Sequence, residues 1–490
     1  MAMRFGNGVE SSTMYPLPLM FYIGRDGVYD EEGNLWFDYF GPTPLPLIGN
    51  LHNLFWHQPG YGFTALNKKR YKNIWTWWMG NTPVVVICDY DLMKETFVKD
   101  GDSYSDKFHF KGMNEVFRGG NYGLAEANGV LWREHRRFAL HQLRDLGLGK
   151  MKMEERILVE VEDISTKLQT VKKLDIQEAV HHAVSNVINQ LMFGYRFVGD
   201  KKKELERLEA MMKKHKTSAG GVMLIIFLFE RARKLPFFRT KFQEFIEFKD
   251  EFFGFFEKQI EQHREEIDYE AEDSTDYVEA YLKEQRSREI EGDRKSFCNL
   301  QLKNVVFDLW QAGLGTTTAT ISWGIVYLLN HPDIQEKMHE ELDRVINSSR
   351  FVTMNDKAAL PYTSAVALEV QRALNLVVLN LPHTTTKDWS WLTLESIFMM
   401  RLCSQTLRDL ILRGSWRMES LRTYPEVMPF SLGKRQCPGE GLAKMEIFLI
   451  FANLINRFKF ISDKPPSLKK TFVNMQKPAD FIDFRAESRF

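Results

Sequence analysis

Apolar residues follow helical spacing along most of the chain after about residue 90, recurring every three or four positions. Earlier, two short runs rich in β-branched and aromatic residues, Trp75–Trp78 and Pro83–Cys88, indicate strands instead. We therefore expect a mainly α protein with a small β portion. The helical pattern covers residues 130–145, 151–171, 176–194, 240–290 and 300–330, and an apolar stretch predicts a further helix from about Glu440 to Phe458.

The chain has one marked break in composition near its start. The run from Gly41 to Pro46, Gly-Pro-Thr-Pro-Leu-Pro, is too rigid to be helical. It separates residues 1–40 from the rest of the chain. This N-terminal segment is atypical and lacks the features of a signal peptide. No Gly/Ser-rich linker divides residues 41–490, so we expect a single large domain there.

Charge and cysteine content narrow the functional classes. Among 490 residues, Lys plus Arg and Asp plus Glu both number 65, so the formal net charge is zero. Without a chain-wide positive field, we expect no nucleic-acid partner. Four cysteines cannot cross-link a fold of this size, which favours a reducing compartment.

Two apolar stretches raise the question of membrane contact. Val305 to Leu329 is long enough to span a bilayer and has Asp308 as its only charge. Because glycine, threonine and other polar residues interrupt it, we predict a buried central helix instead. Gly221 to Phe229 is too short to span and precedes a basic cluster. It fits a membrane interface and an ordinary buried helix equally well.

The strongest chemical signal is the segment from Phe430 to Gly439, Phe-Ser-Leu-Gly-Lys-Arg-Gln-Cys-Pro-Gly. Its proline suits the first helical position, which places Cys437 on a loop just before a helix N-terminus, where a thiolate is favoured. One isolated cysteine cannot complete a zinc site, but it can be the single protein ligand of a haem iron. Taken alone, it would be an inert buried cysteine; with these neighbours, we predict the haem ligand.

This segment closely resembles the haem-binding signature of the cytochrome P450 family. The resemblance spans roughly residues 41–388 and 425–490 and is closest to the animal microsomal, drug-metabolising branch. It implies the cytochrome P450 fold, a single large haem-binding domain with a long central helix. It also implies haem (iron protoporphyrin IX) with an axial thiolate from Cys437, and cofactor contacts from Phe430, Gly439 and Ala312.

Trp132 and Arg136 lie four residues apart, on one face of a predicted helix. An indole N–H and a guanidinium could both donate to a haem propionate. By themselves they would fit a surface ion-pairing helix better, but the resemblance implies the propionate role. It implies the same role for Arg435 and His383.

Ala312-Gly313-Leu314-Gly315-Thr316-Thr317 places two glycines inside a predicted helix, which is costly without a purpose. A dinucleotide-binding loop does not fit, because no strand precedes it and no third glycine follows. The resemblance implies an oxygen-binding kink, with Thr316 as the hydroxyl that relays protons to dioxygen. Gly315 stands where the family usually has Asp or Glu, so we expect slower oxygen cleavage or leakage to peroxide.

The resemblance also fails in places. It implies that Glu369 and Arg372, three apart on a helix, brace the cysteine loop together with a further arginine. The family normally has a strand-rich stretch with that arginine before the cysteine loop, and Trp389 to Tyr424 shows neither. Residues 1–40 lack the microsomal apolar anchor. Candidates for the arginine are Arg413, Arg417 and Arg422.

The leading hypothesis is a haem-thiolate monooxygenase that inserts one atom of O₂ into a small apolar substrate, a xenobiotic, lipid or steroid. The resemblance implies electrons from NADPH through a cytochrome P450 reductase, and a place on the cytoplasmic face of the endoplasmic reticulum membrane, with weak attachment or none. Two alternatives stay open: an inactive haem-binding homologue, and a reductase-independent peroxide isomerase or dehydratase. Expected pocket residues are Phe108, Phe110, Met113, Phe117, Ala312, Val378 and Leu379; expected reductase-docking residues are Arg133, Arg137, Lys434 and Lys444.

Overall fold

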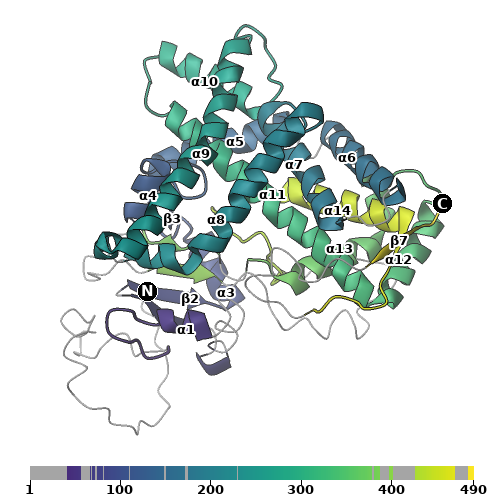
Figure 1. Ribbon diagram of the computed structural model, residues 1–490, viewed down its shortest axis with the longest axis horizontal. Helices are drawn as coiled ribbons and strands as arrows, with labels where there is room; N and C mark the ends of the chain where they lie inside the picture. The colour runs from purple at the N-terminus through teal and green to yellow at the C-terminus, as the bar shows by residue number, and fades with distance from the viewer. Residues whose placement is uncertain are drawn as a thin grey trace.

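The computed structural model describes most of the chain, and helices dominate what it describes (Figure 1). The described residues are 41–56, 67, 69–71, 74–80, 82–109, 111–147, 151–170, 175–228, 230–377, 380–386, 397–400, 425–468 and 484–490. The expected mainly α fold class with a small β portion is confirmed. The expectations for residues 1–40 lie outside this set.

The α-helices are distributed along the described chain from Leu51 to Arg457. They are α1 Leu51–Trp56, α3 Tyr90–Met93, α4 Lys111–Arg118, α5 Gly129–Asp145, α6 Met151–Thr170, α7 Ile176–Phe193, α8 Lys202–Leu228, α9 Pro236–Glu266, α10 Tyr277–Ile290, α11 Asn299–Asn330, α12 Pro332–Val345, α13 Pro361–Leu374 and α14 Glu440–Arg457. Short helices of other types are η2 Lys94–Lys99, η3 Gly199–Lys201, η4 Glu230–Lys234 and η5 Met354–Ala359.

The helix predictions hold with one exception. Helices α5, α6, α7, α11 and α14 lie where the apolar spacing places them. The single helix expected over 240–290 is wrong, because the chain forms α9 and α10 with a turn between them. Asp276 starts α10 by accepting a hydrogen bond from the backbone N–H of Glu279, so its side chain caps a new helix.

Helix α11 forms the centre of the molecule (Figure 1). It packs against α7, α9, α13 and α14, and most of its side chains are buried. The prediction of a buried central helix is therefore confirmed for Val305–Leu329. Within the described part of the chain, no helix has both the length and the apolar character needed to cross a membrane.

Helix α8 contains most of the second apolar stretch, Gly221–Phe229. Met223, Ile226 and Phe227 are buried in a cluster with Phe245 of α9. Of the two interpretations left open for Gly221–Phe229, the described side chains favour the buried helix.

A five-stranded sheet lies at one side of the molecule, next to α1 and α3 (Figure 1). Its order is β1-β2-β5-β4-β3, with only β2 and β5 parallel. Strands β1 and β2 confirm the two predicted strands. The expectation that 389–424 contributes no strand is wrong, because β5 comes from it. The strands are β1 Ile74–Met79, β2 Thr82–Ile87, β3 Asp106–Lys107, β4 His383–Thr384 and β5 Ile397–Met400, and a separate pair consists of β6 Phe458–Ile461 and β7 Arg485–Ser488.

Candidate active site

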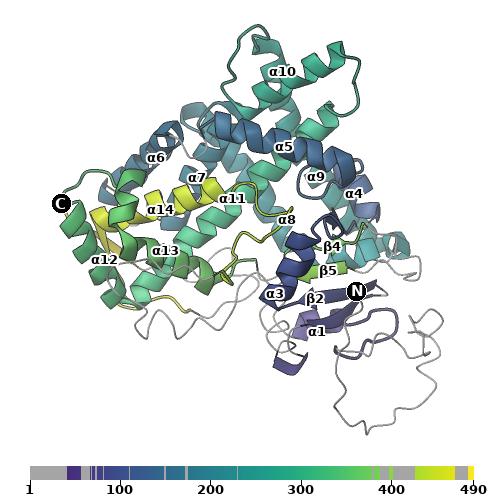
Figure 2. The same ribbon diagram turned by 180° about the vertical axis from the view of Figure 1, so that it is seen from behind.

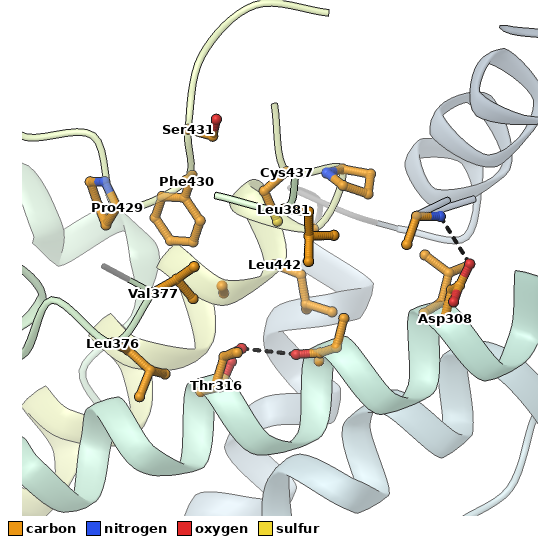
Figure 3. Close-up of a pocket in the computed structure, with 18 of the residues that line it drawn as sticks. Asp308, Thr316, Leu376, Val377, Leu381, Pro429, Phe430, Ser431, Cys437 and Leu442 are labelled. Carbon is orange, nitrogen blue, oxygen red and sulfur yellow. Dashed lines mark hydrogen bonds between the residues drawn. The ribbon is translucent and has the colours of Figure 1, made fainter. Parts of the chain in front are cut away.

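A cavity of about 440 Å³ lies between α11 and the loop that precedes α14. The segment after α13 and part of α5 complete its wall. Figure 3 shows the Cys437 loop on one side and the α11 segment carrying Thr316 on the other, with Val377, Leu381 and Leu442 around the space. Its wall is therefore apolar over most of its area, with polar groups concentrated at a few places.

The loop that carries Cys437 is held by backbone contacts that only some residues permit. Gly433 has φ +78°, and a Cβ there would lie 2.0 Å from the carbonyl oxygen of Phe97. The loop therefore needs glycine at this position. The Cys437 backbone N–H donates to the Phe430 carbonyl at 3.0 Å, which closes the loop on itself. Gly439 leaves space instead: a Cβ there would lie 4.0 Å from Cys437 Sγ.

The Cys437 thiol opens onto the cavity, which is why the residue has a large exposed fraction inside the protein. Burial among apolar side chains raises the pKa of this thiol, although the backbone N–H of Gly439 and the Arg136 guanidinium act in the opposite direction. Burial therefore acts against the predicted thiolate preference in the protein by itself. A bound metal ion would be needed to take the proton off.

On the opposite side, Ala312 and Thr316 are exposed within the otherwise buried middle of α11, because both face the cavity. The Thr316 hydroxyl donates to the Ala312 carbonyl at 2.9 Å (Figure 3). Gly313 has a packing role, since a Cβ there would lie 2.6 Å from Ile188 Cδ1 of α7. Gly315 has none: a Cβ there would meet nothing within 4 Å.

Four basic side chains line one end of the cavity: Lys107, Arg136, His383 and Arg435. Lys107 and His383 are cross-strand partners of β3 and β4, and Lys107 Nζ lies 2.6 Å from His383 Nε2. His383 Nδ1 lies 2.7 Å from the Tyr104 carbonyl. In the tautomer these contacts indicate, His383 therefore donates to Tyr104 and accepts from Lys107.

Backbone carbonyls hold the two arginines of this basic cluster. Arg136 donates to the Gln436 carbonyl at 2.5 Å, which ties α5 to the Cys437 loop. Figure 2 shows α5 beside the chain that leads into α14. Arg435 donates to the carbonyls of Ser105 and Ala127 at 2.7 and 2.6 Å, and its guanidinium lies 3.6 Å from the ring centroid of Trp132.

The described acids of the cavity wall, Asp308 and Glu446, do not contribute to the electrostatics of the basic cluster, although Asp106 acts on Arg435 and Glu126 on Lys107 from outside the wall. Burial lowers the pKa of Arg435 to about 9, with Arg136 adding to the effect. Burial also lowers the pKa of Lys107 and of His383 well below their usual values, and each is lowered further by basic neighbours. Trp132 Nε1 is buried without a hydrogen-bond partner. This end of the cavity would thus be stabilised by an anionic ligand that accepts hydrogen bonds.

These features fit haem. Cys437 offers a single soft ligand beside the clear space at Gly439, the middle of the cavity is apolar, and the basic cluster with Trp132 matches two carboxylates. Eight of the ten predicted residues line the cavity: Cys437, Arg136, His383, Arg435, Phe430, Gly439, Ala312 and Thr316. Trp132 is connected to the site by its contact with Arg435, and Gly315 lies next to Thr316 on α11.

The Glu369–Arg372 pair forms as expected, whereas the expected third arginine and several expected pocket residues have other outcomes. Arg372 makes a bidentate pair with Glu369, with N···O distances of 2.6 and 2.5 Å. The candidate third arginines, Arg413, Arg417 and Arg422, lie outside the described residues. Phe117, expected in the pocket wall, packs instead among Phe245, Phe253 and Phe307. The expectations for Phe110, Val378 and Leu379 also lie outside the described residues or side chains.

Comparison with known proteins agrees with this geometry. The family model described as cytochrome P450 matches residues 40–391 and 414–482. This chain belongs to the cytochrome P450 family. It is similar to cytochrome P450 2H2 of Gallus gallus, 33% identical over 85% of this chain and 86% of the relative. It is 31% identical to cytochrome P450 2B4 of Oryctolagus cuniculus and to cytochrome P450 2A13 of Homo sapiens, each over 87% of this chain and 88% of the relative.

As a cytochrome P450, the protein is a haem-thiolate monooxygenase. The cavity residues that the sequence did not reveal include Lys107 and Glu446. Lys107 reaches the site only because β3 pairs with β4, and His383 is 276 residues away along the chain. Glu446 follows Cys437 by nine positions on the predicted α14 helix, so helical spacing could have suggested that it faces α11.

Proposed function

We propose that this cytochrome P450 hydroxylates small apolar organic molecules with O₂, using electrons from NADPH delivered by a separate reductase. The observation that carries the proposal is the placement of Cys437 across one cavity from Ala312 and Thr316, with the basic cluster at its end. Haem, when bound, supplies the reductive activation of dioxygen.

The residues of the chain then have distinct tasks. Cys437 would ligate the iron of a bound haem, and Gly439 leaves room beside its sulfur. The propionates would be held by Trp132, Arg136, Lys107 and Arg435, and His383 orients Lys107 through the 2.6 Å contact. Thr316 presents a hydroxyl to the oxygen side, where it must exchange its bond to Ala312 for one to an oxygen atom in the cavity.

The substrate class follows from the wall on the oxygen side. Leu376, Val377, Leu381 and Ala312 present hydrocarbon to the cavity, and the described wall offers no charged group there besides Asp308, which is paired. A lipid, steroid or xenobiotic of low polarity would gain free energy by leaving water for this space.

The surface around the Cys437 loop suits an acidic redox partner. Arg133, Arg137, Lys434 and Lys444 are exposed near the loop. Asp102 forms ion pairs with Lys434 and Arg133, and Lys444 pairs with Glu440 at 2.5 Å. These acids reduce the net positive charge, so we expect electrostatic steering of the reductase to be moderate.

We further propose weak association with the cytoplasmic face of the endoplasmic reticulum membrane. The turn between α8 and α9 exposes Leu235 and Phe237, which are 54% and 60% accessible, beside the exposed basic residues Arg231 and Lys234. An apolar pair with a basic border suits a lipid interface and gives reversible binding when acting alone. This turn replaces the buried Gly221–Phe229 stretch as the contact.

A reduced, carbon-monoxide difference spectrum of the expressed protein tests the haem-thiolate site. We expect a strongly red-shifted Soret band that Cys437→Ser abolishes. Cys298→Ser is the matched control, because Cys298 lies at the start of α11 outside the cavity wall, and it should keep the band. Absence of haem uptake by the wild-type protein would contradict the proposal.

Dependence on reductase then separates the remaining alternatives. Substrate hydroxylation that requires NADPH and reductase supports the monooxygenase. The open position at Gly315 favours one rival specifically, because isomerising a peroxide needs no acid to deliver protons. The peroxide isomerase or dehydratase would be established if the protein turned over an organic peroxide without NADPH and did not hydroxylate an alkane-like substrate in the presence of NADPH and reductase.

A further inference from the structure

The chemistry proposed above consumes protons, and the inference here rests on that proposed function. Substrate, O₂, two electrons and two protons give hydroxylated product and one water. Both protons must reach the oxygen side of a largely apolar cavity. Among the described residues that line it, Asp308 and Glu446 carry carboxyl groups. Gly315 contributes no acid.

Asp308 is already engaged in structure. Its carboxylate accepts from Arg118 Nη2 at 2.8 Å and from the backbone N–H groups of Leu124 and Ala125 at 2.6 and 2.9 Å. All three partners are donors, so these contacts occupy both oxygens of Asp308 as acceptors. Asp308 therefore ties Leu124 and Ala125 to α11 and has a structural role.

Glu446 has the opposite surroundings. It lies on α14, is 1% exposed, and faces α11 from the side of the Cys437 loop. The Thr317 hydroxyl hydrogen-bonds its carboxyl group, and its Oε1 atom is buried without a partner. Burial raises the pKa of Glu446 to about 8, against the opposing effect of Thr317, so this acid carries a proton at neutral pH.

We propose that Glu446 is the proton donor for the oxygen side of the cavity, acting through the hydroxyl of Thr317. The carboxyl O–H gives its proton to Thr317 Oγ1 as the Thr317 hydroxyl gives its own to a water or oxygen atom in the cavity. The carboxylate left behind is reprotonated by a proton from bulk solvent, which reaches it through water entering the cavity. Thr317 is next to Thr316 on α11, and both line the cavity.

The charge surroundings allow this cycle. Among the residues that the structure describes, no basic side chain contributes to the electrostatics of Glu446, whereas Asp308 has Arg118 beside it. An acid without a counter-ion holds its proton until an acceptor of higher proton affinity forms nearby, which is the behaviour a general acid needs.

The decisive variant is Glu446→Gln, which keeps the size and the contact with Thr317 but has no proton to release. We expect an unchanged reduced carbon-monoxide spectrum, product formation lowered roughly tenfold to a hundredfold, and the missing electrons recovered as hydrogen peroxide. Glu160→Gln is the control, because Glu160 is also a buried acid with a raised pKa but lies outside the cavity wall. It should keep wild-type coupling of NADPH to product.

Two further measurements keep the test decisive if Glu446→Gln loads haem poorly. Infrared spectra of the haem-free protein should show the carbonyl stretch of a protonated carboxyl group at neutral pH, lost in Glu446→Gln. Thr317→Val should raise peroxide release while keeping this band. Adding Gly315→Asp to Glu446→Gln should recover coupling, because a side chain at 315 meets no neighbour.

The proposal is overturned if the carboxyl band is absent at neutral pH, or if Glu446→Gln with an intact spectrum couples like the wild type. Failure of the wild-type protein to show a thiolate spectrum would instead remove the proposed function itself. The infrared band would then still report the protonation of Glu446.

Discussion

The Cys437 side of the cavity and the α11 side differ in how much of their polar chemistry is fixed by the protein. On the Cys437 side, Arg136 and Arg435 donate to loop carbonyls, and Gly433 fits tightly against Phe97. On the α11 side, Thr316 bonds only to its own helix, and Gly315 borders open space. One side is built to hold a cofactor rigidly, and the other leaves room for reactants.

This difference indicates where substitutions should abolish the enzyme and where they should only tune it. Changes on the Cys437 side alter the backbone path or an unbalanced charge, so they affect folding and haem uptake. Changes at the cavity-facing Thr316 and at Gly315 alter groups with few contacts to other elements, so they affect coupling and the free energy of unfolding by smaller amounts.

The largest expected effect separates the two glycines of the Cys437 loop. Gly433→Ala places a Cβ 2.0 Å from a carbonyl oxygen at φ +78°, so the loop must move, at a cost of at least about 1–3 kcal/mol in backbone strain alone. We expect little or no haem uptake, measured by Soret absorbance per protein. Gly439→Ala, with its Cβ 4.0 Å from Sγ, should fold normally and bind haem with altered affinity. Equal loss in both variants would contradict the proposed packing role of Gly433.

The sequence could predict the Cys437 side better than the rest of the site. Cys437 and its neighbours are adjacent in sequence, and Trp132 and Arg136 share a helix face, so local patterns could mark them as candidates. The propionate role of the pair came from the family resemblance, because spacing alone favoured a surface helix. Lys107 depends on strand pairing across 276 residues, which no local pattern encodes. The burial that raises the pKa of the Cys437 thiol was not predictable either, because it depends on side chains from several elements.

The fold was predictable to a similar degree. Long helices with strong apolar spacing, such as α7 and α11, were placed to within a residue or two. The turn between α9 and α10 was missed, because charged residues at helical spacing continue on both sides of it and only the Asp276 cap marks the new start. Strand β5 is stabilised by β2 and β4 from distant parts of the chain, so its own sequence carries little signal.

A second, intermediate effect concerns pH and the basic cluster. The pKa of His383 is well below 6.5 in the folded, haem-free protein, chiefly through burial and then Lys107. Below pH 6.5 the unfolded chain binds a proton at this histidine that the folded chain does not. The free energy of unfolding should therefore fall as pH is lowered from 6.5, by up to about 1.4 kcal/mol per pH unit.

Denaturant titrations of the haem-free protein between pH 7.5 and about 5.5 measure this slope. Other buried histidines also contribute, so the informative quantity is the difference between wild type and His383→Gln, which should have the shallower slope. Haem loading should flatten the wild-type slope as well, since carboxylates beside the cluster favour its charged form. Parallel curves for wild type and variant would show that His383 is not the group involved.

The smallest expected effect tests the α11 side itself, using its two neighbouring glycines. Gly315→Ala should raise the free energy of unfolding by about 0.5–1 kcal/mol, because alanine has the higher helix propensity and its Cβ meets no neighbour within 4 Å. Gly313→Ala gains the same propensity but presses Cβ to 2.6 Å from Ile188 Cδ1, so α7 must give way. We expect it to be less stable than Gly315→Ala, and the gap between the two measures how tightly α7 and α11 are packed. Equal stabilisation by both variants would mean that the Ile188 side chain moves freely and that α7 is not tightly packed against α11 at Gly313.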